Sequence, residues 1–222
     1  MAWCESVAWC ESVAGVTRWL LDFAADANDP AGEAIAGFVR LELREAESIA
    51  WYWTYLVGVP GIDGVLVVRD HEVLLPRQGL EIRADGLWAE LTCETRLEHW
   101  TFGLEAFGVR LDEPDDARRP GGEIGERLAV GLDIEWEVGP DGPPSGLVHG
   151  DVLVGRARFE IDGPGWFYDD DTPDPDRVEG DEVARAYVPL GDVVDAHGYI
   201  ERRLVRADGG LRWSLERHAP DR

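Results

Sequence analysis

Hydrophobic and polar residues alternate most regularly between residues 80 and 112, and this alternation predicts a three-stranded antiparallel meander. Asp85-Gly86 has the composition of a two-residue hairpin turn, because both central residues of such a turn need positive φ. With residues 95–98 as the second loop, one register places the apolar residues of all three strands on one face and the polar residues on the other. The polar face then pairs Arg83 with Trp88, Glu81 with Glu90, Trp88 with Glu105 and Glu94 with His99.

Alternation with a period of two continues along most of the remaining chain. Residues 38–44 and 127–138 alternate as half-buried strands. Residues 49–57 are apolar on both faces, which is typical of a strand between two layers or beside a ligand cavity. A strand at 147–161 changes phase at Gly155, which indicates a β-bulge. Three more strands are expected at 183–190, 199–206 and 211–218.

One segment has a different period. Apolar residues recur with i, i+3, i+4, i+7 spacing from Val16 to Phe23, which predicts a short amphipathic helix over residues 15–28. Residues 1–14 contain the tandem copy AWCESV-AWCESV and are expected to form a disordered tail. Residues 162–182 are rich in Asp, Gly and Pro and are expected to form an acidic loop. Residues 15–222 are therefore predicted to form a single all-β domain, an antiparallel β-barrel or strongly curved sandwich with one N-terminal helix.

Composition narrows the classes of partner. The 222 residues are 45% hydrophobic, which is enough for a sizeable core. The formal net charge is −24, and this argues against binding to nucleic acid or to an anionic membrane. All 21 basic residues are arginine, so a Schiff-base or P-loop lysine is excluded, and the absence of lysine is typical of GC-rich coding. The chain shows no signal-peptide pattern and no apolar run near 20 residues, which predicts a cytoplasmic protein without a membrane span.

Four segments carry a resemblance to a known family. They are VVRDHEV (67–73), LEIRADGLWAEL (80–91), CET-x-x-EHW-x-x-GLEAFGVRLD (93–112) and GDVLVGRARFEIDGPG (150–165). Across residues 36–168 the chain resembles the lipocalin-like family that includes carotenoid 1,2-hydratase. The resemblance implies a lipocalin-like barrel that holds long apolar molecules, and reactions such as hydration or cyclisation, including the Diels–Alder type. The chain differs from the family at Trp166-Phe167-Tyr168-Asp169, where a histidine-tryptophan segment is expected.

The candidate catalytic residues are carboxylates and histidines near aromatic residues. A carboxylic acid can protonate an alkene, and a histidine held by a carboxylate can act as a general base. The candidates are Glu105, Glu94, His99 and His71. Two simpler interpretations stay open, a solvated polar face for the meander and surface ion pairs for the histidines. The candidate ligand-binding residues are Trp51, Tyr52, Trp53, Tyr55, Trp88, Arg83, Trp100, Phe102 and Trp136.

Neither a metal nor a cofactor is expected. The histidines lack a third ligand at a defined spacing, and the acidic stretch 169–176 lacks the glycine and terminal glutamate of an EF-hand loop. The expected function is that of a cofactor-free enzyme that binds an apolar polyene, isoprenoid or polyketide in an aromatic-lined barrel and catalyses hydration, isomerisation or cyclisation. The alternative is a non-catalytic binding protein for a hydrophobic small molecule. The expected partner is this small molecule, and the sequence leaves a homodimer open.

Overall fold

The computed structural model describes residues 16–27, 34–62, 64–112 and 123–169, together with the backbone of 186–191, 199–207 and 210–218. This part of the chain contains thirteen strands and the 3-10 helix η1 (Glu45–Glu47). The strands are β1 (Val16–Ala27), β2 (Ala34–Arg44), β3 (Ile49–Val57), β4 (Leu66–Leu74), β5 (Leu80–Ala84), β6 (Leu87–Thr95), β7 (His99–Leu111), β8 (Gly125–Val138), β9 (Ser145–Val154), β10 (Ala157–Asp169), β11 (Ala186–Gly191), β12 (Tyr199–Ala207) and β13 (Gly210–His218).

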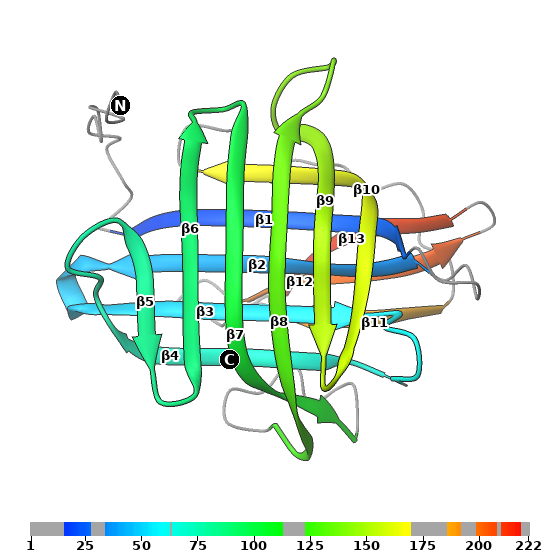
Figure 1. The fold of residues 1–222 in the computed structure, drawn as a ribbon, viewed down its shortest axis with the longest axis horizontal. Helices are drawn as coiled ribbons and strands as arrows, with labels where there is room; N and C mark the ends of the chain where they lie inside the picture. Colours follow the sequence, from blue (N-terminus) through cyan, green and yellow to red (C-terminus); the bar gives the residue numbers. More distant parts are fainter. Residues whose placement is uncertain are drawn as a thin grey trace.

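Antiparallel pairing joins strands β1–β10 into one sheet that closes on itself. The strand order is β4-β3-β2-β1-β10-β9-β8-β7-β6-β5, and β4 also pairs with the end of β7. This extra pairing completes a ring of eight strands, β1-β2-β3-β4-β7-β8-β9-β10, from which the β5–β6 hairpin extends along the first half of β7. In Figure 1, strands β6–β9 cross the front of β1–β4 almost at right angles. The predicted antiparallel barrel is therefore confirmed, and its two layers pack orthogonally.

Buried aromatic and aliphatic side chains pack together in the interior of the barrel. Phe167 of β10 is fully buried, and its ring centroid lies 4.8 Å from that of Trp100, 5.3 Å from that of Trp136 and 5.9 Å from that of Phe102. On the opposite wall Tyr52 is also fully buried and accepts a hydrogen bond of 2.9 Å from the Thr54 hydroxyl. A ring of eight strands is wide enough for side chains to fill. These residues therefore form the core of the barrel.

The meander has the predicted register along most of its length. Asp85-Gly86 is the turn between β5 and β6, and Arg83 pairs with Trp88, which pairs with Glu105. Of the two turn residues only Gly86 has a positive φ, of 76°, so the expected turn with positive φ at both residues is wrong. The expected pairing of Glu94 with His99 is wrong, because a register shift after Cys93 places Thr95 opposite His99. The irregularity follows from the turn at residues 96–98, where Leu97 has a φ of 60°.

The predicted N-terminal helix is absent, because residues 16–27 form strand β1. This strand pairs with β2 on one side and with β10 on the other. Leu21 and Phe23 face the interior of the barrel, whereas Leu20 belongs to a second apolar cluster on the other side of the strand. A strand that is buried on both faces carries apolar residues at odd and even positions, and these can imitate helical spacing.

Two expectations about residues 147–182 are also corrected. Gly155 is part of a two-residue hairpin turn between β9 and β10, with Val154 opposite Ala157, and is not a bulge within one strand. The change of phase therefore marks a reversal of the chain, for which the φ of 61° at Gly155 is suited. Residues 162–169 of the expected acidic loop belong to β10. The rest of that loop, residues 170–182, and the duplicated tail, residues 1–14, lie outside the described residues.

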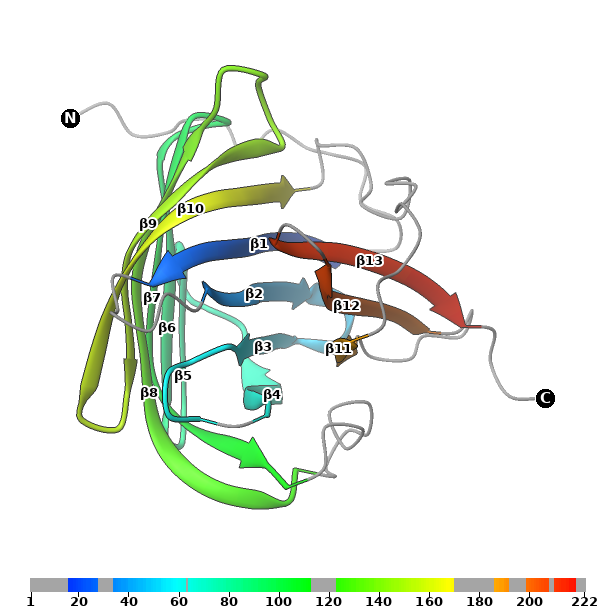
Figure 2. The same ribbon diagram turned by 90° about the vertical axis from the view of Figure 1, so that its right-hand side faces the viewer.

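A second, three-stranded sheet has the order β11-β12-β13. Figure 2 shows it on the far side of β1–β4 from β6–β9, so that β1–β4 form the middle layer. The face of β1–β4 that points away from the barrel interior, here called the outer face, carries its own buried apolar cluster. Its fully or almost fully buried residues include Phe38, Trp53, Tyr55 and Val67. As expected from the sequence, β3 is buried on both faces.

Candidate functional site

The outer face of β1–β4 changes from apolar to charged along the strands. The pairing register places side chains in rows that cross the strands. The rows are Ala24–Ala36–Val57, Asp22–Phe38–Tyr55–Val67, Leu20–Arg40–Trp53–Arg69 and Arg18–Glu42–Trp51. The last two rows bring several charged residues against two tryptophans, and this end of the outer face is the candidate site.

A β-bulge in β4 places a histidine beside these rows. β3 and β4 pair regularly as far as Tyr52, and then the register shifts by one residue, so that His71 and Glu72 together oppose Trp51. The backbone N–H of Glu72 donates a hydrogen bond of 2.9 Å to the Asp70 carboxylate, which satisfies a donor at the irregularity. Bulges re-aim side chains and are enriched beside active sites.

His71 lies against two indole rings, and the three residues are here called the tryptophan–histidine cluster. The imidazole centroid is 4.8 Å from that of Trp51, with a tilt of 32°, and 5.4 Å from that of Trp53, which it meets edge-on. Two arginines of β2 stack on the same indoles. The guanidinium carbon of Arg44 is 4.0 Å from the Trp51 ring and that of Arg40 is 4.8 Å from the Trp53 ring. Such cation–π contacts hold both rings in place.

A buried carboxylate holds these arginines. The Glu42 side chain is only 4% exposed, and its oxygens lie 2.6 Å from Arg40, 3.0 Å from Arg18 and 3.4 Å from Arg44. A carboxylate that is removed from water must be compensated by partners of opposite charge. Glu42 therefore anchors the charged end of the outer face.

Arg69 of β4 forms a second anchor. Its side chain is 4% exposed, donates a hydrogen bond of 3.0 Å to the hydroxyl of Tyr55, and pairs with Glu123 from the segment that leads into β8. This network attaches β8's leading segment to the outer face of β3 and β4.

Burial keeps the imidazole of His71 uncharged at neutral pH. Burial and the nearby Arg69 guanidinium lower the pKa of His71 to about 4, against the opposing effect of carboxylates that include Glu123 and Asp70. A neutral imidazole with this pKa is a weak base at pH 7 but a good hydrogen-bonding group. Its Nε2 atom is out of contact with solvent and has no hydrogen-bond partner among the described residues.

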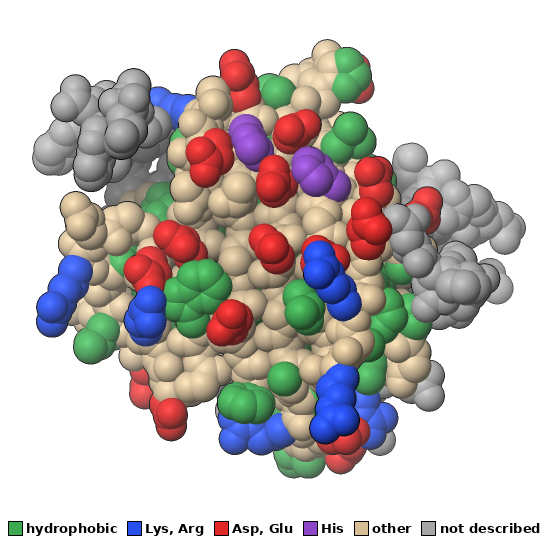
Figure 3. All heavy atoms as spheres, in the orientation of Figure 1, with side chains coloured by type: hydrophobic (Ala, Val, Ile, Leu, Met, Phe, Trp, Pro, Cys, Tyr) green, Lys and Arg blue, Asp and Glu red, His purple; other side chains and the backbone are tan. Residues whose placement is uncertain are grey.

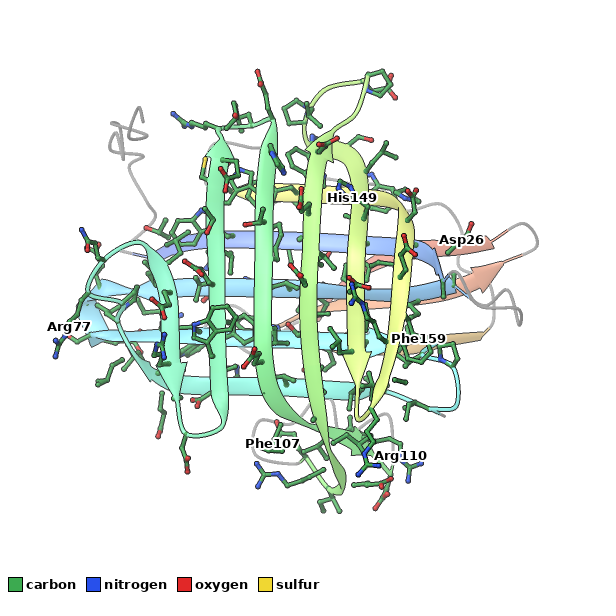
Figure 4. All side chains as sticks on the ribbon, in the orientation of Figure 1. Asp26, Arg77, Phe107, Arg110, His149 and Phe159 are labelled. Atoms are coloured by element: carbon green, nitrogen blue, oxygen red, sulfur yellow. The ribbon has the colours of Figure 1, made fainter. Side chains whose placement is uncertain are left out.

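The four predicted catalytic residues do not converge. Glu105 and Glu94 are exposed on the front of β7 and β6. His99 contacts Glu135 of β8, with 2.9 Å between its Nε2 and the carboxylate, and His149 of β9 approaches the same oxygen at 3.6 Å. Figure 3 shows the two histidines among acidic side chains on this face, and Figure 4 shows His149 at the upper end of β9. His71 is on the opposite side of the barrel.

The predicted ligand-binding residues divide among three places. Tyr52, Trp100, Phe102 and Trp136 lie inside the barrel, where they pack in the core. Trp51, Trp53 and Tyr55 share the outer face. Trp88 and Arg83 lie on the front of the meander, where both donate hydrogen bonds to Glu81, over 3.0 Å and 2.7 Å. Among the described residues, only the outer-face group combines aromatic rings with a histidine whose Nε2 atom is buried without a hydrogen-bond partner.

The sequence interpretation missed the charged residues of β2. Arg40, Glu42 and Arg44 alternate with apolar residues, so they were expected on a solvated face. The neighbouring strand could have indicated their burial. Residues 49–57 are apolar on both faces, which implies that other parts of the chain cover the outer face of this layer. Asp22 of β1, 6% exposed on the same face, was concealed by the helical interpretation of residues 15–28.

Comparisons of the chain with models of protein families, with curated proteins and with solved structures find no match. None of the helices in the described residues has the length and apolar character needed to cross a membrane.

Proposed function

We propose that the protein binds an apolar small molecule at the charged end of the outer face, against the tryptophan–histidine cluster. The observation that carries the proposal is the bulge in β4, which sets a neutral histidine with an unpartnered nitrogen against two tryptophans. Small-molecule sites combine aromatic surface with a few polar groups that fix the orientation of the ligand. The tryptophan–histidine cluster has this composition.

The exposure of the cluster supports binding at one edge. Trp53 is 1% exposed, whereas Trp51 and His71 retain partial exposure. Arg44, whose side chain is 22% exposed, covers the Trp51 ring. We infer that a ligand reaches Trp51 by displacing Arg44, because a flexible side chain at a rim moves more readily than the packed rings behind it.

Two further points favour an apolar ligand. The aromatic residues of the barrel interior are buried, whereas Trp51 on the outer face retains partial exposure. The resemblance of residues 36–168 to the lipocalin-like family implies ligands of the isoprenoid or polyketide type.

Nile red, a neutral dye whose emission rises in apolar surroundings, tests the proposal. The full-length protein should enhance its fluorescence saturably, and Trp51→Ala should weaken binding about tenfold through the loss of one aromatic surface. The matched control is Phe107→Ala. Phe107 is 59% exposed near the lower end of β7, on the front of the molecule in Figure 4, and its loss should leave dye binding unchanged.

Near-ultraviolet circular dichroism establishes that each variant is folded. Absence of saturable binding by the wild-type protein would overturn the proposal. Equal affinity of the wild type and a folded Trp51→Ala variant would show that the dye binds elsewhere on the protein.

We propose catalysis as a second candidate, because the outer face also holds a buried carboxylate. Asp22 is 6% exposed, and its neighbours in the register are Phe38 of β2 and Trp166 of β10. Acid-assisted alkene chemistry needs a proton donor sheltered from water beside aromatic rings that stabilise positive charge. Asp22 fits this need better than the exposed Glu105.

The test is incubation with farnesene in ¹⁸O-labelled water, followed by mass spectrometry for an added water molecule or an isomer. If the protein is an enzyme of this kind, Asp22→Asn should lower the rate by ~10²–10⁴ and Glu105→Gln should leave it unchanged. Equal rates in the two variants would exclude Asp22 as the acid, and no product from the wild type would contradict catalysis on alkenes.

A further inference from the structure

Two ring nitrogens of the tryptophan–histidine cluster are buried without a hydrogen bond. Within the described residues, neither Nε1 of Trp51 nor Nε2 of His71 has a partner, although both are out of contact with solvent. Nε1 of Trp100 also lacks a hydrogen-bond partner, but it lies inside the barrel, away from these two nitrogens. Trp51 and His71, by contrast, are in ring contact, with 4.8 Å between their centroids. A buried polar group without a partner is destabilising, so two at one place indicate a binding partner.

The chemistry of these nitrogens selects the group that would satisfy them. The indole N–H of Trp51 can only donate a hydrogen bond. A neutral imidazole donates or accepts at Nε2, according to its tautomer. A hydroxyl oxygen can accept from Trp51 and donate to His71, and a carbonyl oxygen can accept from both. Either would complete the hydrogen bonding of the cluster.

The surrounding charges disfavour an anionic ligand. Arg18, Arg40 and Arg44 contact Glu42, Arg44 also contacts Glu47, and Arg69 pairs with Glu123. Each guanidinium is thus already engaged by a carboxylate, and the net charge of −24 repels an approaching anion. A carboxylate would have to share these guanidinium groups with glutamates whose like charge repels it.

The same face disfavours a cationic ligand. An aromatic ring attracts a cation to its face, but the guanidinium groups of Arg44 and Arg40 lie 4.0 Å and 4.8 Å from the Trp51 and Trp53 rings and repel a further cation there. We therefore infer that the site selects an apolar molecule with an uncharged oxygen, a hydroxyl or a carbonyl, which bridges Trp51 Nε1 and His71 Nε2. The inference rests on the proposed binding function and names its ligand class.

A series of farnesyl compounds with one apolar chain and different end groups provides the test. Farnesol, farnesal, farnesoic acid, farnesylamine and farnesene are compared at pH 8 by their displacement of Nile red from the full-length protein. Farnesol and farnesal should bind roughly five- to tenfold more tightly than farnesene, the size expected for hydrogen bonds to buried groups. The acid and the amine should bind no more tightly than farnesene.

Two variants assign the preference to the ring nitrogens. Trp51→Phe and His71→Phe keep an aromatic ring but remove the nitrogen, so each should lower the ratio of farnesol affinity to farnesene affinity, measured within the same variant, severalfold. His149→Phe is the control for a histidine on the front of the barrel, and it should preserve the wild-type preference.

Three outcomes would overturn the inference while leaving the binding site in place. They are equal displacement by all five compounds, tightest binding of the acid or amine, and a farnesol advantage that survives in both Trp51→Phe and His71→Phe. If Nile red binds but no farnesyl compound displaces it, the site does not accept this ligand class, and the inference fails. If Nile red itself does not bind, the proposed function fails first.

Discussion

The replacement of Glu42 by glutamine should destabilise the protein because three arginines lose the buried carboxylate that they contact. The substitution keeps the size of the side chain and removes its charge. Three guanidinium groups lie within 3.4 Å of the Glu42 oxygens, but they differ in exposure. The Arg18 side chain is 52% exposed, so water replaces its partner at little cost, and Arg44 keeps its contact with Glu47. The effect therefore comes mainly from Arg40, which is 11% exposed.

Removal of one partner from a buried ion pair costs about 3–5 kcal/mol. Arg40 retains some contact with solvent, and the glutamine oxygen can still accept a hydrogen bond. We therefore expect Glu42→Gln to lower the free energy of unfolding by about 2–3 kcal/mol. For a domain of this size, such a loss corresponds to a fall in Tm of roughly 4–12 °C.

Urea unfolding followed by tryptophan fluorescence measures the change, with Glu126→Gln as the matched control. Glu126 lies 3.4 Å from Arg110, but its side chain is 59% exposed, so its loss should cost less than about 0.5 kcal/mol. Equal changes in the two variants, at an unchanged m-value, would refute the argument that burial makes the Glu42 contacts strong.

Three further predictions concern the same layers. Because burial lowers the pKa of His71 to about 4, the unfolded state takes up a proton at higher pH than the folded state, and stability falls as the pH drops from 6.5 towards 4. Wild type should lose about 1–2 kcal/mol more than His71→Gln between pH 7 and 4.5, after allowance for partial exposure, and equal losses in urea titrations would contradict this. Gly37→Ala should cost about 2–3 kcal/mol because its Cβ would overlap the Tyr55 carbonyl oxygen, whereas Gly139→Ala, with ordinary contacts, should unfold like wild type. Phe167→Ala should lower the unfolding free energy by about 3–5 kcal/mol, and a loss below 1 kcal/mol would show that the barrel interior repacks.

The sequence was most informative where one face of a strand is buried and the other is solvated. In the meander the alternation is unambiguous, so the pairing of Trp88 with Arg83 and Glu105 was predicted correctly. In β1 both faces are buried, and the spacing from Val16 to Phe23 matched a helix although the segment is a strand. Periodicity identifies a strand poorly when cover on both sides makes every position apolar.

The candidate site was predictable in its components but not in its assembly. The sequence named Trp51, Trp53 and His71 as candidates, but it gave no sign that a bulge brings the three together. A bulge depends on pairing between strands, which a single-sequence pattern does not encode. The arginines and glutamate of β2 looked solvated, because the sheet that lies behind them is formed by residues far along the chain.

The bulge in β4 also means that chain length, as well as residue identity, can determine whether this barrel has its site. One extra residue is accommodated between two correctly paired segments, with Tyr52 opposite Asp70 on one side and Ala50 opposite Val73 on the other. Deletion of Glu72 would restore a regular ladder while both flanking pairs kept their partners. A homologue or a designed variant one residue shorter at this point would keep the barrel core but present a different histidine geometry. Single-residue deletions and insertions in β4 are thus a natural way to vary ligand recognition on an unchanged scaffold.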